Sequence, residues 1–110
     1  MAGWFELNKN ANGQFHFVLK AGNAETILTS ETYNTKSAAE NGIASVQANS
    51  SHEDRYERKT SSNQKPYFNL KAINHQVIGT SQMYSSNEAR EAGIASVKTN
   101  GSSKTIKDNA

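Results

Sequence analysis

Hydrophobic and polar residues alternate along several short stretches of the chain, and turn residues separate these stretches. In "WFELN", Phe5 and Leu7 lie on one face of an extended strand. The stretches 14–21 and 25–30 alternate in a similar way, and the latter directs Ile27 inward. The Asn-Gly pair at 12–13 is a strong hairpin signal because both residues tolerate a positive φ. The pattern predicts three strands, followed by a helix that begins near residues 35–37.

The same order of elements recurs after a shift of 51 residues. Residues 4–50 align with 55–101 without a gap, and about 19 of the 47 pairs are identical, against ~6% for unrelated residues. Each copy is therefore one supersecondary unit that depends on the other to bury its apolar face. We expect an α+β domain spanning residues 1–110, with 1–51 as the first repeat and 52–110 as the second. One helix per repeat packs on one face of an antiparallel sheet, and the repeats are related by a pseudo-twofold axis.

Several details of this plan remain open in the sequence. The two sheets could join edge to edge or pack separately. The stretch 55–60 matches both the end of the second repeat and the start of the first, so it could close one unit and open the next. In the second repeat Gln64 and Ile73 replace the turn glycines, so we expect Asn74 to carry the second turn. Pro66 fits a strand start or a sheet edge.

Both predicted helices carry a stripe of small residues with a glycine in the middle. A capping-box spacing is present at Ser37–Glu40 and at Ser85–Glu88. Mid-helix glycine costs about 1 kcal/mol relative to alanine, so its recurrence indicates a close backbone approach, to the sheet or to the other helix. Replacement by leucine should then overpack the site. We expect the aromatic rings of Tyr33 and Tyr84 to anchor the helix starts. The expected helix-packing residues are Gly42, Ile43 and Val46, with Gly93, Ile94 and Val97 in the second copy.

Three long motifs carry a resemblance to a known family. They are "FVLKAGNAETILTSETY" (17–33), "YFNLKAINHQVIGTSQMY" (67–84) and the two "GIASV" strings. With these motifs the chain resembles the YegP-like family of small uncharacterised bacterial proteins over nearly its whole length. The resemblance implies two β3-α-β units that share one sheet and exchange their terminal strands. It further implies that single-unit members form homodimers, whereas this tandem form is a monomer with an internal pseudo-dimer. The family has no established activity, so the resemblance assigns no functional residue to this chain.

Composition narrows the function classes. Lys+Arg 12 against Asp+Glu 10 gives a net charge of only +2, far from a strongly basic nucleic-acid binder. With no cysteine, the chain has neither a disulfide framework nor a zinc-thiolate site. The N-terminal residues lack a signal-peptide pattern, and no apolar run approaches the ~20 residues of a membrane span. A cytoplasmic location is the expectation.

Catalytic chemistry has little support in the sequence. His16, His52 and His75 show no metal-ligand spacing, and no phosphate loop or nucleophile elbow occurs. We therefore expect no catalytic residue, metal or cofactor. The leading hypothesis is a non-catalytic binding or accessory protein with an unknown partner.

The predicted sheet face away from the helices is the most promising binding surface. Aromatic and basic residues there could stack bases and neutralise phosphates, so single-stranded nucleic-acid binding is one alternative. A protein-interaction module that uses a sheet edge is another. Alternation also demands polar residues on such a face without any ligand. The candidate residues are Trp4, His16, Lys20, Arg55, Lys59, Tyr67 and Lys71, flanked by Val18 and Asn69.

Overall fold

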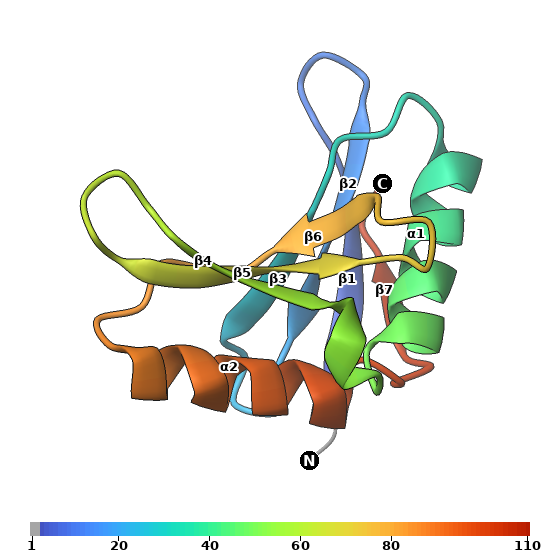
Figure 1. The fold of residues 1–110 in the computed structure, drawn as a ribbon. Helices are drawn as coiled ribbons and strands as arrows, with labels where there is room; N and C mark the ends of the chain where they lie inside the picture. The colour runs from blue at the N-terminus through green and yellow to red at the C-terminus, as the bar shows by residue number, and fades with distance from the viewer. Residues whose placement is uncertain (1–2) are drawn as a thin grey trace.

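The computed structural model describes residues 3–110 as one seven-stranded sheet with two helices (Figure 1). The α+β class and the two helices are confirmed. The sheet order is β4-β5-β6-β3-β2-β1-β7. The elements are β1 (Trp4–Lys9), β2 (Phe15–Lys20), β3 (Thr26–Ser30), α1 (Lys36–Asn49), the 3₁₀ turn η1 (Glu53–Arg55), β4 (Tyr56–Thr60), β5 (Pro66–Lys71), β6 (Val77–Thr80), α2 (Asn87–Asn100) and β7 (Ile106–Asp108).

The repeats join edge to edge, which the alternation pattern alone had left open. β3 pairs antiparallel with β6 at the centre of the sheet, with Thr29 opposite its counterpart Thr80. The outermost strand β7 follows α2 in the second repeat, yet it pairs in parallel with β1 of the first. The sheet is therefore mostly, not wholly, antiparallel. The terminal-strand exchange implied by the family resemblance is present at this edge. At the opposite edge β4 pairs with β5 and serves as the first strand of the second repeat.

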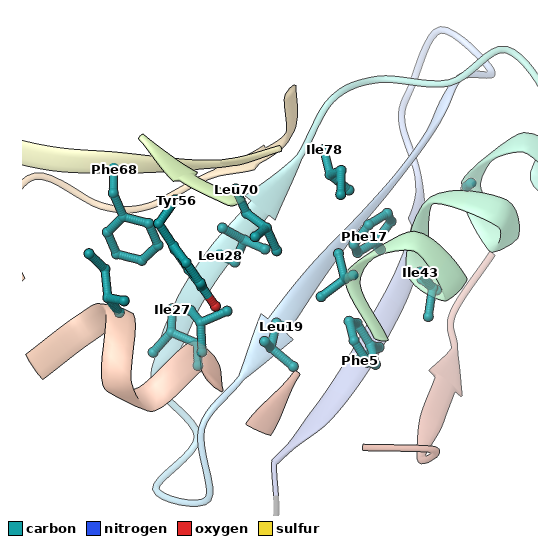
Figure 2. Close-up of a cluster of buried hydrophobic side chains, with 14 of the residues drawn as sticks. Phe5, Phe17, Leu19, Ile27, Leu28, Ile43, Tyr56, Phe68, Leu70 and Ile78 are labelled. Atoms are coloured by element: carbon teal, nitrogen blue, oxygen red, sulfur yellow. The ribbon is translucent and has the colours of Figure 1, made fainter. Parts of the chain in front are cut away.

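The hydrophobic core lies between one face of the sheet and the two helices (Figure 2). Alternation places Phe5, Phe17 and Leu19 of the first repeat and Phe68 and Leu70 of the second fully inside. A bulge in each β2–β3-type hairpin interrupts the alternation, so neighbouring residues of one strand can both be buried. The core is completed by Leu7, Ile27, Leu28, Ala39, Ile43, Val46, Tyr56, Ile78, Ile94 and Val97.

Two pairs of equivalent residues touch one another at the junction of the repeats. A Cβ on Gly79 would lie 2.9 Å from Cγ of its counterpart Leu28, and one on Gly101 would lie 2.4 Å from Cβ of its counterpart Ser50. Each contact has room for one side chain, because a second would overlap the first. The glycines of the second repeat at these positions therefore follow from the meeting of the two units.

The helix caps differ from the predicted capping boxes. Thr35 caps α1, its hydroxyl accepting the backbone N–H of Ala38, and Ser86 caps α2 by accepting from Ala89. Ser37, the cap that the Glu40 spacing suggested, lies inside the first helix, two residues after the observed cap. Thr and Ser are both good N-caps, so a choice between neighbouring hydroxyl residues depends on the chain direction into the helix.

The turns of the second repeat keep left-handed backbone without glycine. Gln64 has a φ of 70°, where its counterpart Gly13 has 84°. In the next turn the left-handed residue is His75 (φ 69°), as Ala24 is in the first repeat (φ 71°). The prediction that Asn74 takes this conformation is wrong. Its side-chain oxygen instead accepts the N–H of Gln76, a local bond that asparagine makes readily in turns.

Candidate functional site

The sheet face away from the helices carries most of the predicted surface residues. Trp4 lies across from Lys20 on β1 and β2, and Lys59 across from Tyr67 on β4 and β5. His16 lies on the same face, across from Asn8. Trp4, His16, Lys20 and Tyr67 alternate with core residues along their strands, so they point away from the helices. Lys59 lies on the same face as its cross-strand partner Tyr67.

Several groups on this outer face are already bonded to one another. The indole N–H of Trp4 donates to Glu6 at 2.9 Å, and the Lys107 ammonium lies 4.3 Å from the centre of the Trp4 ring system. The Lys71 ammonium forms an ion pair with Glu57 at 3.0 Å, and this bond lowers the pKa of Glu57. Polar contacts between neighbouring side chains therefore cover part of this face. Lys20 and Lys59 are further basic residues on it, and Tyr67 is a further aromatic residue.

Arg55 does not belong to this face, contrary to the prediction. It lies in η1, before β4 begins. Its Nε donates to Asn49 at the end of α1 at 3.0 Å, and its Nη1 pairs with Asp54 at 2.7 Å. The 51-residue shift aligns Arg55 with Trp4 and so predicts an equivalent position on the outer face. In the structure the chain leaving α1 forms a 3₁₀ turn here, and the Arg55 side chain lies at the end of the helix.

Two small pockets lie where a hairpin of one repeat meets the helix of the other. The Tyr84 pocket, of about 190 Å³, lies between the β2–β3 turn and α2. The Tyr33 pocket, of about 240 Å³, lies between the β5–β6 turn and α1. Six positions of the lining carry the same residue in both pockets. In the Tyr84 pocket they are Ala21, Asn23, Ile27, Tyr84, Gly93 and Ser96, and their counterparts 51 residues away line the other.

The repeated helix glycine makes room for the tyrosine of each pocket. The Tyr33 ring stacks on Phe17 and the Tyr84 ring on Phe68, both with ring centres 6.3 Å apart. A Cβ on Gly93 would lie 2.1 Å from the Tyr84 hydroxyl oxygen, and one on Gly42 would lie 2.5 Å from that of Tyr33. The close approach expected from the sequence thus involves a tyrosine of the same repeat. At Gly42 the sheet residue Phe17 also contributes, at 2.8 Å.

The pockets differ in charge at one equivalent position. Glu25 lines the Tyr84 pocket, where Gln76 lines the Tyr33 pocket. Burial raises the pKa of the Tyr84 phenol, and the negative charge of Glu25 raises it further. Burial likewise raises the pKa of Tyr33, with Glu31 as the nearby charge. Both phenols are therefore neutral at pH 7 and can act as hydrogen-bonding groups, not as bases.

The pattern of residues along the chain does not reveal these pockets. The identity of Asn23 and Asn74, and of Ser45 and Ser96, between the repeats was a visible signal. However, each pocket unites residues of different repeats, and only the joined sheet brings them together. Part of this identity also has a structural cause, because Asn23 accepts the N–H of Glu25 in its turn at 3.1 Å.

An ion-pair cluster covers the helix side of β4. Arg58 binds Glu91 of α2 through Nη2 and Glu53 of η1 through Nη1, both at 2.8 Å. Lys98 of α2 pairs with the other oxygen of Glu53. Hydrogen bonds from Arg58 and then Lys98 lower the pKa of Glu53 to about 2, and the bond from Arg58 lowers that of Glu91. Neither carboxyl is available as an acid near neutral pH.

Within residues 3–110, no group of three or more His, Cys, Asp or Glu side chains could hold a metal ion. His16 lies on β2, while His52 precedes η1 and His75 lies in the β5–β6 turn. Among the same residues, neither helix is long and apolar enough to cross a membrane.

The fold defines a small α+β protein in which two tandem repeats of three strands and a helix build one sheet. The chain belongs to the family described as Domain of unknown function (DUF1508), which matches it twice, at residues 10–57 and 61–108. The family resemblance noted from the sequence motifs is thereby confirmed.

Relatives cover nearly the whole chain. UPF0339 protein YegP of Escherichia coli strain K12 is 68% identical over 109 residues, 99% of each chain. UPF0339 protein ACIAD0721 of Acinetobacter baylyi is 63% identical, over 98% of this chain and 97% of the relative. The solution NMR structure of the E. coli protein, described as a protein of unknown function, has a TM-score of 0.94 and covers 99% of this chain and 94% of its own. That of UPF0339 protein SO3888 from Shewanella oneidensis has a TM-score of 0.92 at 65% identity, over 98% and 92%.

Proposed function

We propose that this protein is a non-catalytic binding protein whose two inter-repeat pockets bind small polar molecules. The observation that carries the proposal is the recurrence of the same six-residue lining in two separate places. Each lining combines an apolar floor with a phenol, an asparagine and a serine. Such a mixture suits a ligand with a short carbon skeleton and one or two polar groups.

Size and charge limit the ligand. Sites for drug-sized ligands usually measure about 300–1,000 Å³, so pockets of 190 and 240 Å³ suit molecules of a few non-hydrogen atoms. Among the described residues that line the Tyr84 pocket, Glu25 is the one that carries a charge, and this favours a small organic cation. The Tyr33 pocket is lined by neutral groups and favours an uncharged polyol or amide.

An NMR titration with ethanolamine, a cation at pH 7, and with glycerol tests this proposal. We expect ethanolamine to shift amide signals of the Tyr84 pocket and glycerol those of the Tyr33 pocket, both saturably. Glu25→Gln should weaken ethanolamine binding about fivefold, as for one partly exposed ion pair, and Gln76→Glu should create ethanolamine binding in the other pocket. Titrations that stay linear in both pockets would contradict the proposal. So would catalytic turnover on a broad substrate panel that one polar substitution abolishes.

Single-stranded nucleic-acid binding on the outer sheet face is a second candidate. It is favoured by Tyr67 beside Lys59 and by Trp4 beside Lys20, which are aromatic and basic neighbours on adjacent strands. Short single strands should then shift the signals of Trp4, His16, Lys20, Tyr67 and Lys71, and added salt should weaken the effect. An unchanged spectrum at low salt would eliminate this candidate.

A further inference from the structure

The strands β1 and β4 occupy equivalent positions in the two repeats but differ in what pairs with their outer edge. At β1 the edge is occupied by β7, in the register Phe5–Ile106, Glu6–Lys107 and Leu7–Asp108. The backbone N–H of Phe5 donates to Thr105 at 2.9 Å, and the carbonyl of Leu7 accepts from Asn109 at 2.8 Å. A strand following a helix of the second repeat thus completes the first.

At β4, the counterpart of β1, no described residue supplies a strand beyond the edge. The first outward group is satisfied locally, since the N–H of Tyr56 donates to the carbonyl of Glu53 in η1. Outward-facing residues alternate along a strand, so the backbone groups of Arg58 and Thr60 also point away from β5. Both residues are exposed. Figure 1 shows β4 beside the β4–β5 loop, at the opposite side of the sheet from β7.

The side chains of β4 match the order of charges on β7. In the existing pair, Phe5-Glu6-Leu7 faces Ile106-Lys107-Asp108, an apolar, a basic and an acidic residue. The same positions of β4 read Tyr56-Glu57-Arg58. An incoming strand of that order would place its basic residue opposite Glu57 and its acidic residue opposite Arg58. The second pairing would be ionic, whereas Leu7 offers no charge to Asp108.

The charges around the β4 edge favour an acidic residue in the incoming strand. Arg58 and Lys98 balance Glu53 and Glu91. Arg90 pairs with Glu91 at 3.3 Å and donates to the carbonyl oxygen of Lys59 at 3.2 Å, so it is a third cation beside these two carboxylates and leaves one positive charge in excess. Charged residues on an edge strand oppose unspecific strand pairing. The same charges select a partner when their order is matched.

We propose that the β4 edge is a docking site for an extended peptide segment of another protein, running parallel to β4, with an apolar, a basic and an acidic residue in consecutive positions. Its backbone bonds to Arg58 and Thr60 as β7 bonds to Leu7, and its charged side chains pair with Glu57 and Arg58. Recognition is by strand addition, in which main-chain bonds supply affinity and side chains supply selectivity. The site is independent of the two inter-repeat pockets.

A synthetic peptide with the sequence of residues 101–110 (GSSKTIKDNA) is a suitable probe, because it carries the required order at Ile106-Lys107-Asp108. Added to the labelled protein, it should shift the amide signals of Arg58, Lys59 and Thr60. A control peptide in which the lysine and aspartate at 107 and 108 are exchanged has the same composition and should bind about tenfold more weakly.

Two protein variants locate the site. Thr60→Pro removes an outward N–H of β4 and should abolish the shifts, whereas Lys9→Pro, at the equivalent position of β1, should leave them unchanged. The folding of each variant is checked by its amide spectrum. If Thr60→Pro does not fold, the test is the difference in binding between the original and the exchanged peptide on the wild-type protein. Three results would overturn the proposal: no shift at β4, shifts confined to Phe5–Leu7 because the peptide has displaced β7, or equal binding of both peptides.

Discussion

At the scale of single residues, the repeated helix glycine is a consequence of the repeated tyrosine. Tyr84 stacks on Phe68 and extends its hydroxyl under α2, where a side chain on Gly93 would overlap it. Tyr33 and Gly42 repeat the arrangement under α1. The small-residue stripe thus borders a pocket, while the neighbouring isoleucine and valine of each helix are buried in the core.

Replacing Gly93 by alanine tests this contact. In an unobstructed helix the change would stabilise the protein by about 1 kcal/mol, because alanine is the better helix former. Here we expect a loss of about 1–3 kcal/mol in the free energy of unfolding, since the new methyl group overlaps the phenol. Urea unfolding gives the sign directly, and a stabilised variant would show that the contact is not tight.

The partner substitution Tyr84→Phe serves as the control. It removes the oxygen nearest to the added methyl group but leaves the ring carbon Cζ, at 2.5 Å. The double variant should therefore recover part, but not all, of the stability lost in Gly93→Ala. Simple additivity of the two changes would contradict a direct contact.

At the scale of elements, β4 is distinguished from β1 by its charges. Its sequence places Arg58 where β1 has the buried Leu7, and the guanidinium joins α2 and η1 to the strand through Glu91 and Glu53. Tyr56 adds a bond from its hydroxyl to the carbonyl of Ser50, at 2.6 Å, at the end of α1. Ion pairs and one buried phenol thus stabilise β4, whereas pairing with β7 and apolar packing stabilise β1.

The ion pairs of Arg58 predict a specific dependence of stability on pH. Glu53 and Glu91 have pKa values in the folded protein below the ordinary value of 4.5, chiefly because of hydrogen bonds from Arg58. Such groups stabilise the fold above the pKa of the unfolded chain, and the contribution is lost as pH falls from about 4.5 towards about 2. Urea midpoints of the wild type and Arg58→Met should therefore differ at pH 7 and converge near pH 2.

Lys65→Met removes the same charge from the exposed β4–β5 turn and corrects for net charge. Its midpoint should run parallel to that of the wild type over the same pH range. A gap between wild type and Arg58→Met that stays constant from pH 7 to pH 2 would show that the carboxyls do not depend on this arginine.

At the scale of the whole molecule, the joining of the repeats explains where they differ. Leu28 and Gly79 are equivalent residues in contact, and so are Ser50 and Gly101. Identical side chains at either pair would compete for one space. The duplicated sequence has therefore kept the larger residue in the first repeat and glycine in the second.

Gly79→Leu should destabilise the protein by about 1–3 kcal/mol or more, because Leu28 already fills the space. The variant Leu28→Gly should also destabilise it, by leaving a cavity. The exchange Leu28→Gly with Gly79→Leu keeps one leucine at the contact and should be more stable than either single variant in urea unfolding. An exchange variant less stable than both would contradict a shared space.

Some features were predictable because they depend on local spacing. Alternation at Phe5, Leu7, Phe17 and Leu19 identified the buried face, and the spacing of Ile43 and Val46 marked the inner side of α1. The outer-face positions of Trp4 and Tyr67 followed from the same rule. Arg55 did not, because a 3₁₀ turn interrupts the alternation that the repeat alignment assumed.

The sequence by itself determined the duplication, the class of fold and the inner and outer faces of each strand, since these follow from the periodicity of side chains along one segment. Only the tertiary structure decided that β3 meets β6, that β7 crosses to β1, and that a hairpin of one repeat completes a pocket on the helix of the other. The reason is physical. Contacts between segments far apart in the sequence depend on which faces and edges are left uncovered after each unit has formed, and the local spacing of side chains does not encode this.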